Sequence, residues 1–156
     1  MAQVRWLDER ESRAWGGLQR MQMQLDAALN RQLSADSALS HSDYAVLVTL
    51  TARPDGRMRI SELGQANGWE KSRTSHHLAR MSGRGLIEKQ ACDSDRRGAF
   101  VVVTDHGRDV IADAAPGHVE IVRRLFVDRL TPDELVVIAR VSETVLAALA
   151  EEPGPT

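Results

Sequence analysis

The feature that most restricts the fold of this chain is a pair of short amphipathic segments on either side of a glycine turn. The first, residues 61–67, opens with serine and glutamate, which favour a helix start, and Gly68 follows it where helices end with a left-handed residue. The second, residues 71–83, places Leu78 and Met81 on one face. Two short helices joined by a tight turn that contains glycine make a helix-turn-helix.

A β-hairpin is predicted directly after these helices. Residues 86–91 and 100–103 are short β-prone runs, and the polar sequence between them, Asp93-Ser94-Asp95-Arg96-Arg97-Gly98, is typical of an exposed hairpin tip. A hairpin in this place makes the wing of a winged helix. We therefore predict a winged helix-turn-helix lobe over residues 42–104, whose first helix covers residues 42–52.

Long helical patterns flank this lobe and assign residues 5–36 and 105–151 to terminal helices. Pro116 and Gly117 should kink or interrupt the second of these stretches. Its last part, from residue 131, is apolar around most of its surface, and the rest of the chain has few elements left to cover it. We therefore infer a partner subunit. The apolar face of the first helix consists of Trp15, Leu18, Met21, Leu25, Leu29 and Leu33.

The predicted fold class is mainly α with a small β-hairpin wing, in a single domain over residues 1–156. The length suits one ordinary domain, and 42% hydrophobic and 27% charged residues are typical of a globular chain. No apolar run is long enough to span a membrane and the first residues contain no hydrophobic leader, so we expect a cytoplasmic protein without a membrane partner. Cys92 is the only cysteine, which excludes an intrachain disulfide and a thiolate metal cluster within one subunit.

Charge is distributed unevenly along the chain. The net charge of −2 argues at first against a nucleic-acid partner. Residues 53–97, however, hold ten Lys and Arg against six Asp and Glu, a local charge of +4, whereas the remainder holds ten against sixteen, a charge of −6. The positive part coincides with the predicted helix-turn-helix and hairpin.

The second helix of a helix-turn-helix fits the major groove of DNA, where its first two turns meet base edges. With Leu78 and Met81 buried, the outward positions are Ser72, Arg73, Ser75, His76, Ala79 and Arg80, and His77 lies at the margin. We expect Arg73 to make a bidentate base contact, Lys71 and Arg80 to contact phosphates, and the serines to do either.

Each of these side chains taken alone fits a solvated helix face equally well. The combination with the hairpin favours DNA contact, because Arg96 and Arg97 at its tip have the length and charge to enter an adjoining minor groove. Asp95 beside them either orients Arg97 or simply forms the turn. The candidate DNA-binding residues are therefore Lys71, Ser72, Arg73, Ser75, His76, Arg80, Arg96 and Arg97.

The sequence resembles the MarR (multiple antibiotic resistance regulator) family of transcription factors. The resemblance covers nearly the whole chain and is densest over residues 60–89 and 93–107, which look like that family's helix-turn-helix, recognition helix and wing. The motif Asp95-Arg96-Arg97-Gly98, followed by a strand, Thr104 and Gly107, is similar to its wing signature and supports Arg97 as the minor-groove arginine.

The resemblance implies a homodimer in which the first and last helices interleave and two winged helices bind an inverted repeat, with half-sites about 34 Å apart. It also implies a ligand-responsive regulator, most often a repressor. A small molecule between the dimerisation helices and the DNA-binding lobe would shift the lobes and weaken operator binding. Trp15 and His41 are candidate pocket residues for an aromatic acid, although a tryptophan at helical spacing is also typical of a core.

Several alternatives stay open. A winged helix used only for protein contacts predicts indifference to DNA. A metal-sensing variant would use His76, His77, His106 and His118, although no His-x-x-x-His spacing occurs and no metal or cofactor is expected. A redox-sensing variant would use Cys92, whose apolar neighbours favour a packed strand residue instead. An enzyme is not expected, because the sequence offers no phosphate-binding glycine loop, no nucleophile with a placed base and no spaced carboxylate pair.

Overall fold

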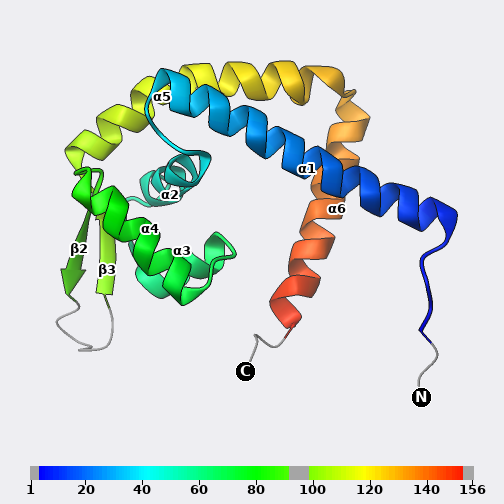
Figure 1. Cartoon of the computed structure of the whole chain (residues 1–156), viewed down its shortest axis with the longest axis horizontal. Coiled ribbons are helices and arrows are strands. Elements are labelled where there is room, and N and C mark those ends of the chain that lie inside the picture. Colours follow the sequence, from blue (N-terminus) through cyan, green and yellow to red (C-terminus); the bar gives the residue numbers. More distant parts are fainter. Residues whose placement is uncertain (1–3, 92–98, 153–156) are drawn as a thin grey trace. The chain divides into compact units, whose positions relative to one another are not determined.

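The structure, a computed structural model, describes residues 4–91 and 99–152, which form helices and one small antiparallel sheet (Figure 1). Their order is α1 (Glu9–Asp36), α2 (His41–Thr51), β1 (Arg57–Arg59), α3 (Ile60–Ala66), α4 (Lys71–Gly83), β2 (Ile87–Ala91), β3 (Ala99–Val103), α5 (Asp105–Leu125), the 3-10 helix η1 (Val127–Arg129) and α6 (Pro132–Glu151). The chain divides into two compact units, with the boundary between His118 and Val119.

The predicted winged helix is confirmed, with one strand that the sequence analysis missed. The helix-turn-helix is α3 and α4, and the hairpin strands are β2 and β3. In addition, β1 pairs antiparallel with β3, with Met58 opposite Val101, so the strand order is β1-β3-β2. Only Met58 of β1 is buried. A run of three residues with one apolar side chain is too short to show the alternation of a strand. The strand β1 is therefore recognised only by its pairing with β3.

The core of the first unit lies between α2, α3, α4 and the sheet. Among its fully buried side chains are Leu47, Leu50, Leu63, Leu78, Met81 and Val101. Gly64 allows α3 to approach α4, because a Cβ at this position would lie 2.9 Å from Oγ1 of Thr74. Gly68 ends α3 with a φ of 63°, a conformation that costs glycine little. The predicted cap is wrong by two residues, since Arg59 occupies the N-cap position and Ser61 lies inside the first turn.

Helix α5 runs without interruption from Asp105 to Leu125 and contains Pro116. Of the two outcomes predicted for Pro116 and Gly117, a kink or an interruption, the interruption is therefore wrong. Proline removes one backbone N–H, and a long helix tolerates this loss when tertiary packing holds the turns before the proline in place. Ile111 and Ala114 provide that packing, since both are buried. The helix ends at Leu125.

The terminal helices carry large apolar side chains that stay exposed in the single subunit. In α1, Leu33 is buried, but Trp15 is 56% exposed and Leu18 and Met21 are each 40% exposed. Helix α6 is capped by Thr131 and contains no buried residue. Its exposed apolar side chains include Val136, Val137, Val141, Val145, Leu146 and Leu149. In the part of the chain that the structure describes, no helix combines the length and apolarity that a membrane crossing requires.

Candidate nucleic-acid interface

The exposed face of α4 is built by its helical spacing. Thr74, Leu78 and Met81 point into the core and are at most 2% exposed. The opposite face presents the predicted contact residues Lys71, Ser72, Arg73, Ser75, His76 and Arg80, all of them exposed. The structure therefore brings these six side chains together on one surface, where hydroxyl and guanidinium groups are available to base edges and phosphates. The predicted wing-tip residues, Arg96 and Arg97, lie outside the described residues.

Trp69, in the turn between α3 and α4, supports the residue predicted to read a base. The Arg73 guanidinium carbon lies 5.0 Å from the centre of the indole ring, within the range of a cation–π interaction. The same ring forms a T-shaped pair with the imidazole of His77, with ring centres 4.9 Å apart and an interplanar angle of 69°. The aromatic turn residue therefore connects an exposed cation to the interior of the lobe. No such role follows from the sequence, in which Trp69 is only part of the predicted turn.

The prediction that His77 lies at the margin of α4 is wrong. His77 is only 7% exposed, and its Nε2 lies 3.0 Å from Oδ1 of Asp43, which is itself 4% exposed and comes from α2. Its Nδ1 lies 3.0 Å from an Nη atom of Arg80. The sequence does not indicate the contact between His77 and Asp43, because the two residues are far apart along the chain and each is ordinary in its own helix.

Asp43 connects three segments of the chain. It completes the α2 capping box with Ser40, and its Oδ2 accepts a hydrogen bond from Arg84, just after α4, at 2.7 Å. Arg84 also donates to the carbonyl oxygen of Ala38, in the turn between α1 and α2, at 2.7 Å. Burial alone would raise the pKa of the Asp43 carboxyl, but the polar contacts with His77, Ser40 and Arg84 outweigh it and hold the pKa well below its usual range.

A second basic surface at the base of the wing also escaped the sequence analysis. On β1, the Arg57 and Arg59 guanidinium carbons lie 4.2 and 5.2 Å from the centre of the Phe100 ring on β3. The two arginines stand at alternate positions of one strand, so they share a face of the sheet. Recognising this surface required β1, which the sequence did not reveal.

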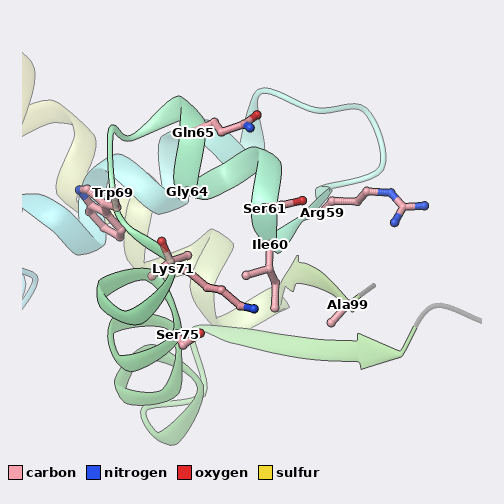
Figure 2. A pocket seen from close by; sticks show the side chains of 10 residues that line it. Arg59, Ile60, Ser61, Gly64, Gln65, Trp69, Lys71, Ser75 and Ala99 are labelled. Atoms are coloured by element: carbon pink, nitrogen blue, oxygen red, sulfur yellow. The ribbon is translucent and has the colours of Figure 1, made fainter. Parts of the chain in front are cut away.

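A pocket of about 490 Å³ lies beside the start of α4, between the helix-turn-helix and the sheet (Figure 2). Its lining includes Arg59, Ile60, Ser61, Gln65, Trp69, Lys71, Ser75 and Ala99. Figure 2 shows Trp69 and Arg59 at opposite ends, with Ile60 and Lys71 between them. The pocket thus combines apolar side chains with the hydroxyls of Ser61 and Ser75 and the cations of Arg59 and Lys71.

The two predicted ligand-pocket residues belong to different helices: Trp15 lies on α1, and His41 begins α2. The backbone N–H of His41 donates to Asn30 at 3.0 Å, and its Nδ1 lies 3.4 Å from Asp26. Trp15 is exposed on the same helix, eleven residues before Asp26, which is about three helical turns away. In one subunit the structure therefore does not bring Trp15 to His41.

His41 instead belongs to a cluster that includes Tyr44 on α2 and His118 on α5. The ring of His118 lies 4.1 Å from that of Tyr44 and 6.2 Å from that of His41, centre to centre. Burial, and secondarily the charge of His41, lowers the pKa of His118. Within the described residues, no three His, Cys, Asp or Glu side chains form a group that could hold a metal ion.

The family model and two similar solved structures agree on one family. A family model described as the MarR family matches residues 39–98. The chain is similar to AbsC, a MarR family transcriptional regulator of Streptomyces coelicolor, with 36% identity, a TM-score of 0.88, and coverage of 96% of this chain and 100% of that one. It is also similar to Sco3205, a MarR family transcriptional regulator of the same organism solved in complex with DNA, with 34% identity, a TM-score of 0.89, and coverage of 99% and 95%.

A curated relative is matched over a shorter region. The transcriptional repressor MprA of Escherichia coli K12 is 26% identical over 96 residues, which are 62% of this chain. The match spans only 54% of the length of MprA.

Proposed function

This chain belongs to the MarR family of transcriptional regulators, and from this premise we propose that it binds an inverted-repeat DNA operator as a homodimer and acts as a ligand-responsive repressor. The family consists of regulators and not of enzymes. The observation that carries the proposal is the exposed face of α4, on which hydroxyl and cationic side chains gather around an arginine fixed over Trp69. A regulator that binds chromosomal DNA must share a compartment with that DNA, so we propose that the protein is cytoplasmic.

The proposed division of labour follows the chemistry of each side chain. Arg73 reads a base in the major groove through its forked guanidinium, with Ser72, Ser75 and His76 beside it. Lys71 and Arg80 bind phosphates and set the register of the helix on the duplex. Arg96 and Arg97 are proposed to reach an adjoining minor groove, with Arg57 and Arg59 adding positive charge at the base of the wing.

The proposed dimer uses the terminal helices. The apolar side chains of α1 and α6 that one subunit leaves exposed support this assignment, because a monomeric protein rarely exposes so many. Two winged helices in a symmetric dimer would contact half-sites about 34 Å apart, one turn of B-DNA.

We propose an aromatic acid as effector, with His41 as the pocket residue that the present contacts favour over Trp15. Within the described residues, Nδ1 of His118 is buried without a hydrogen-bond partner, so it offers a polar atom to a ligand beside Tyr44 and His41. A thermal-shift screen against aromatic acids, antibiotics and divalent metals tests this, read together with release of DNA. A compound that raises the Tm and frees the DNA identifies the effector.

The DNA-binding proposal is tested by selecting duplexes from a random-sequence library with the wild-type protein. We expect a palindromic consensus and an affinity that falls steeply with salt, because phosphate contacts release counterions. A library that yields no enriched sequence, together with the lack of a mobility shift at any salt concentration, would favour a winged helix that contacts only proteins.

A further inference from the structure

His77 joins the interior of the lobe to its DNA-facing surface. It is buried on α4, and one ring nitrogen faces a buried carboxylate while the other faces an exposed arginine. We infer that His77 is a positioning residue for DNA binding, which holds the guanidinium of Arg80 in place against the duplex backbone. This inference rests on the proposed function, because it assigns Arg80 to the DNA interface.

The direction of the hydrogen bond to Arg80 fixes the protonation pattern of the ring. An arginine side chain can only donate, so Nδ1 of His77, 3.0 Å away, must accept and carries no proton. In the neutral ring the single proton is then on Nε2, which lies 3.0 Å from Oδ1 of Asp43. Nε2 makes no hydrogen bond of ordinary geometry with any described residue, but the negative charge of the carboxylate 3.0 Å away favours a proton on this nitrogen, and with it the tautomer that leaves Nδ1 free to accept.

The carboxylate is itself held in place from three directions. Asp43 accepts the backbone N–H of Ser40 at 2.9 Å and the side chain of Arg84 at 2.7 Å, besides its contact with His77. Its low pKa keeps it ionised at physiological pH. The imidazole is thus fixed to the N-terminal end of α2 and not only to its own helix.

The Trp69 ring packs on the imidazole in a T-shaped arrangement, with 4.9 Å between the ring centres, and the guanidinium of Arg73 lies over the same indole. The ring of His77 is consequently confined between Asp43 and Trp69. A fixed acceptor already restricts the rotamers of the Arg80 side chain. The side chain therefore loses less conformational entropy when it binds a phosphate, and this improves affinity. A buried histidine that served only the core would leave Arg80 unaffected.

Two substitutions separate the two nitrogens. His77→Gln places a carboxamide near the position of Nε2, keeps a donor for Asp43 and removes the acceptor for Arg80. His77→Asn places its oxygen near the position of Nδ1 and keeps that acceptor. On a duplex selected from a random library by the wild-type protein, we expect His77→Gln to raise Kd about three- to tenfold and His77→Asn to raise it less than about twofold.

The decisive measurement is the coupling with Arg80→Ala. If His77 acts through Arg80, His77→Gln changes Kd by less than about twofold once Arg80 is alanine. The inference would be overturned if His77→Gln raised Kd by the same factor with Arg80 and with alanine at position 80. It would also be overturned if the Gln and Asn variants raised Kd equally, in proportion to their losses of Tm.

The wild-type protein provides a second measurement that does not depend on how the variants fold. Long-range ¹H–¹⁵N correlation of the imidazole at pH 7.5 should show His77 as the tautomer protonated at Nε2, and a ring protonated at Nδ1 would contradict the inference. A wild-type protein that enriches no duplex rejects the proposed function instead, so the two failures are distinguishable.

Discussion

Arg73 differs from the other cations of α4 in that its guanidinium already lies over an aromatic ring, 5.0 Å from the centre of Trp69. A side chain placed in this way is suited to a bidentate contact with guanine. Arg73→Ala should therefore cost about 1 to 3 kcal/mol of binding free energy on the selected duplex and little on random DNA. Fluorescence anisotropy on both duplexes measures this, with Arg31→Ala, an exposed arginine of α1, as the control. Equal losses on both duplexes would remove Arg73 from base reading.

Ala38 is the one non-glycine residue of the described chain with a positive φ, at 55°. An L-residue is strained in this conformation and glycine is not. We expect Ala38→Gly to raise the free energy of unfolding by about 0.5 to 1 kcal/mol, measured by urea denaturation. Ala35→Gly, at an exposed helical position of α1, should lower it by a similar amount. A loss of stability in both variants would show that Ala38 is not strained.

At this scale the sequence predicted exposure well and contacts poorly. Periodicity around Leu78 and Met81 placed Lys71, Arg73 and Arg80 on the outer face of α4. It could not place His77, because the carboxylate that the buried ring faces comes from the distant Asp43. A pairing between residues from different helices leaves no local pattern.

The close approach of α3 and α4 depends on Gly64, which has no side chain. A Cβ on Gly64 would lie 2.9 Å from the Thr74 hydroxyl and 3.4 Å from the Trp69 carbonyl. Gly64→Ala should therefore destabilise the protein by about 1 to 3 kcal/mol, since a well-packed contact must open. Gly17→Ala on α1 is the control, because its Cβ would meet no atom of the described structure within 4 Å. It should be neutral or stabilising in the same thermal melts, and a neutral Gly64→Ala would argue against a tight crossing.

The packing of α5 on α2 should depend on pH through His118. Burial, with a smaller effect of His41, lowers the pKa of His118 in the folded state, so the unfolded chain takes up the proton first. Its contribution to stability is therefore fully present above about pH 6.5 and is lost as the pH falls. Tm measured from pH 8 to pH 5 should fall less in His118→Gln than in the wild type. His76→Gln, at an exposed position, should leave the profile unchanged; an unchanged profile for His118→Gln would contradict the assignment.

The elements themselves followed from local chemistry wherever that chemistry was strong. Capping residues and apolar spacing located α1, α2, α4 and α6 to within a few residues. The errors arose where tertiary contacts decide, as in β1, which exists through its pairing with β3, and in Pro116, whose helix continues past the proline.

For the whole molecule, the exposed apolar side chains of α6 give the most direct test of assembly. Leu146 is 63% exposed, and Leu146→Lys should place a charge in the proposed dimer interface. We expect sedimentation to show single subunits at micromolar concentration and affinity for the selected duplex to fall at least tenfold, by about 1.4 kcal/mol. Thr144→Lys introduces the same charge at an exposed polar position and should leave the dimer intact. A wild-type monomer that binds the duplex fully would end the dimer proposal.

The sequence also predicted the order of parts across the whole chain, from a helical N-terminus through a winged helix to a helical C-terminus. The uneven charge also located the basic region, since residues 53–97 hold ten Lys and Arg against six Asp and Glu. From the sequence His41 was a candidate, but the cluster proposed to hold an effector was not predicted, because His41, Tyr44 and His118 come together only when α5 folds onto α2.

The carboxylate of Asp43 has an evolutionary consequence. One side chain caps α2, anchors the imidazole of α4 and receives Arg84, so a change at this position disturbs all three contacts together. Homologous sequences should therefore rarely vary at the positions of Asp43, His77 and Arg84 one at a time. We expect them to covary as a set, with lineages that lose the acid also replacing its partners.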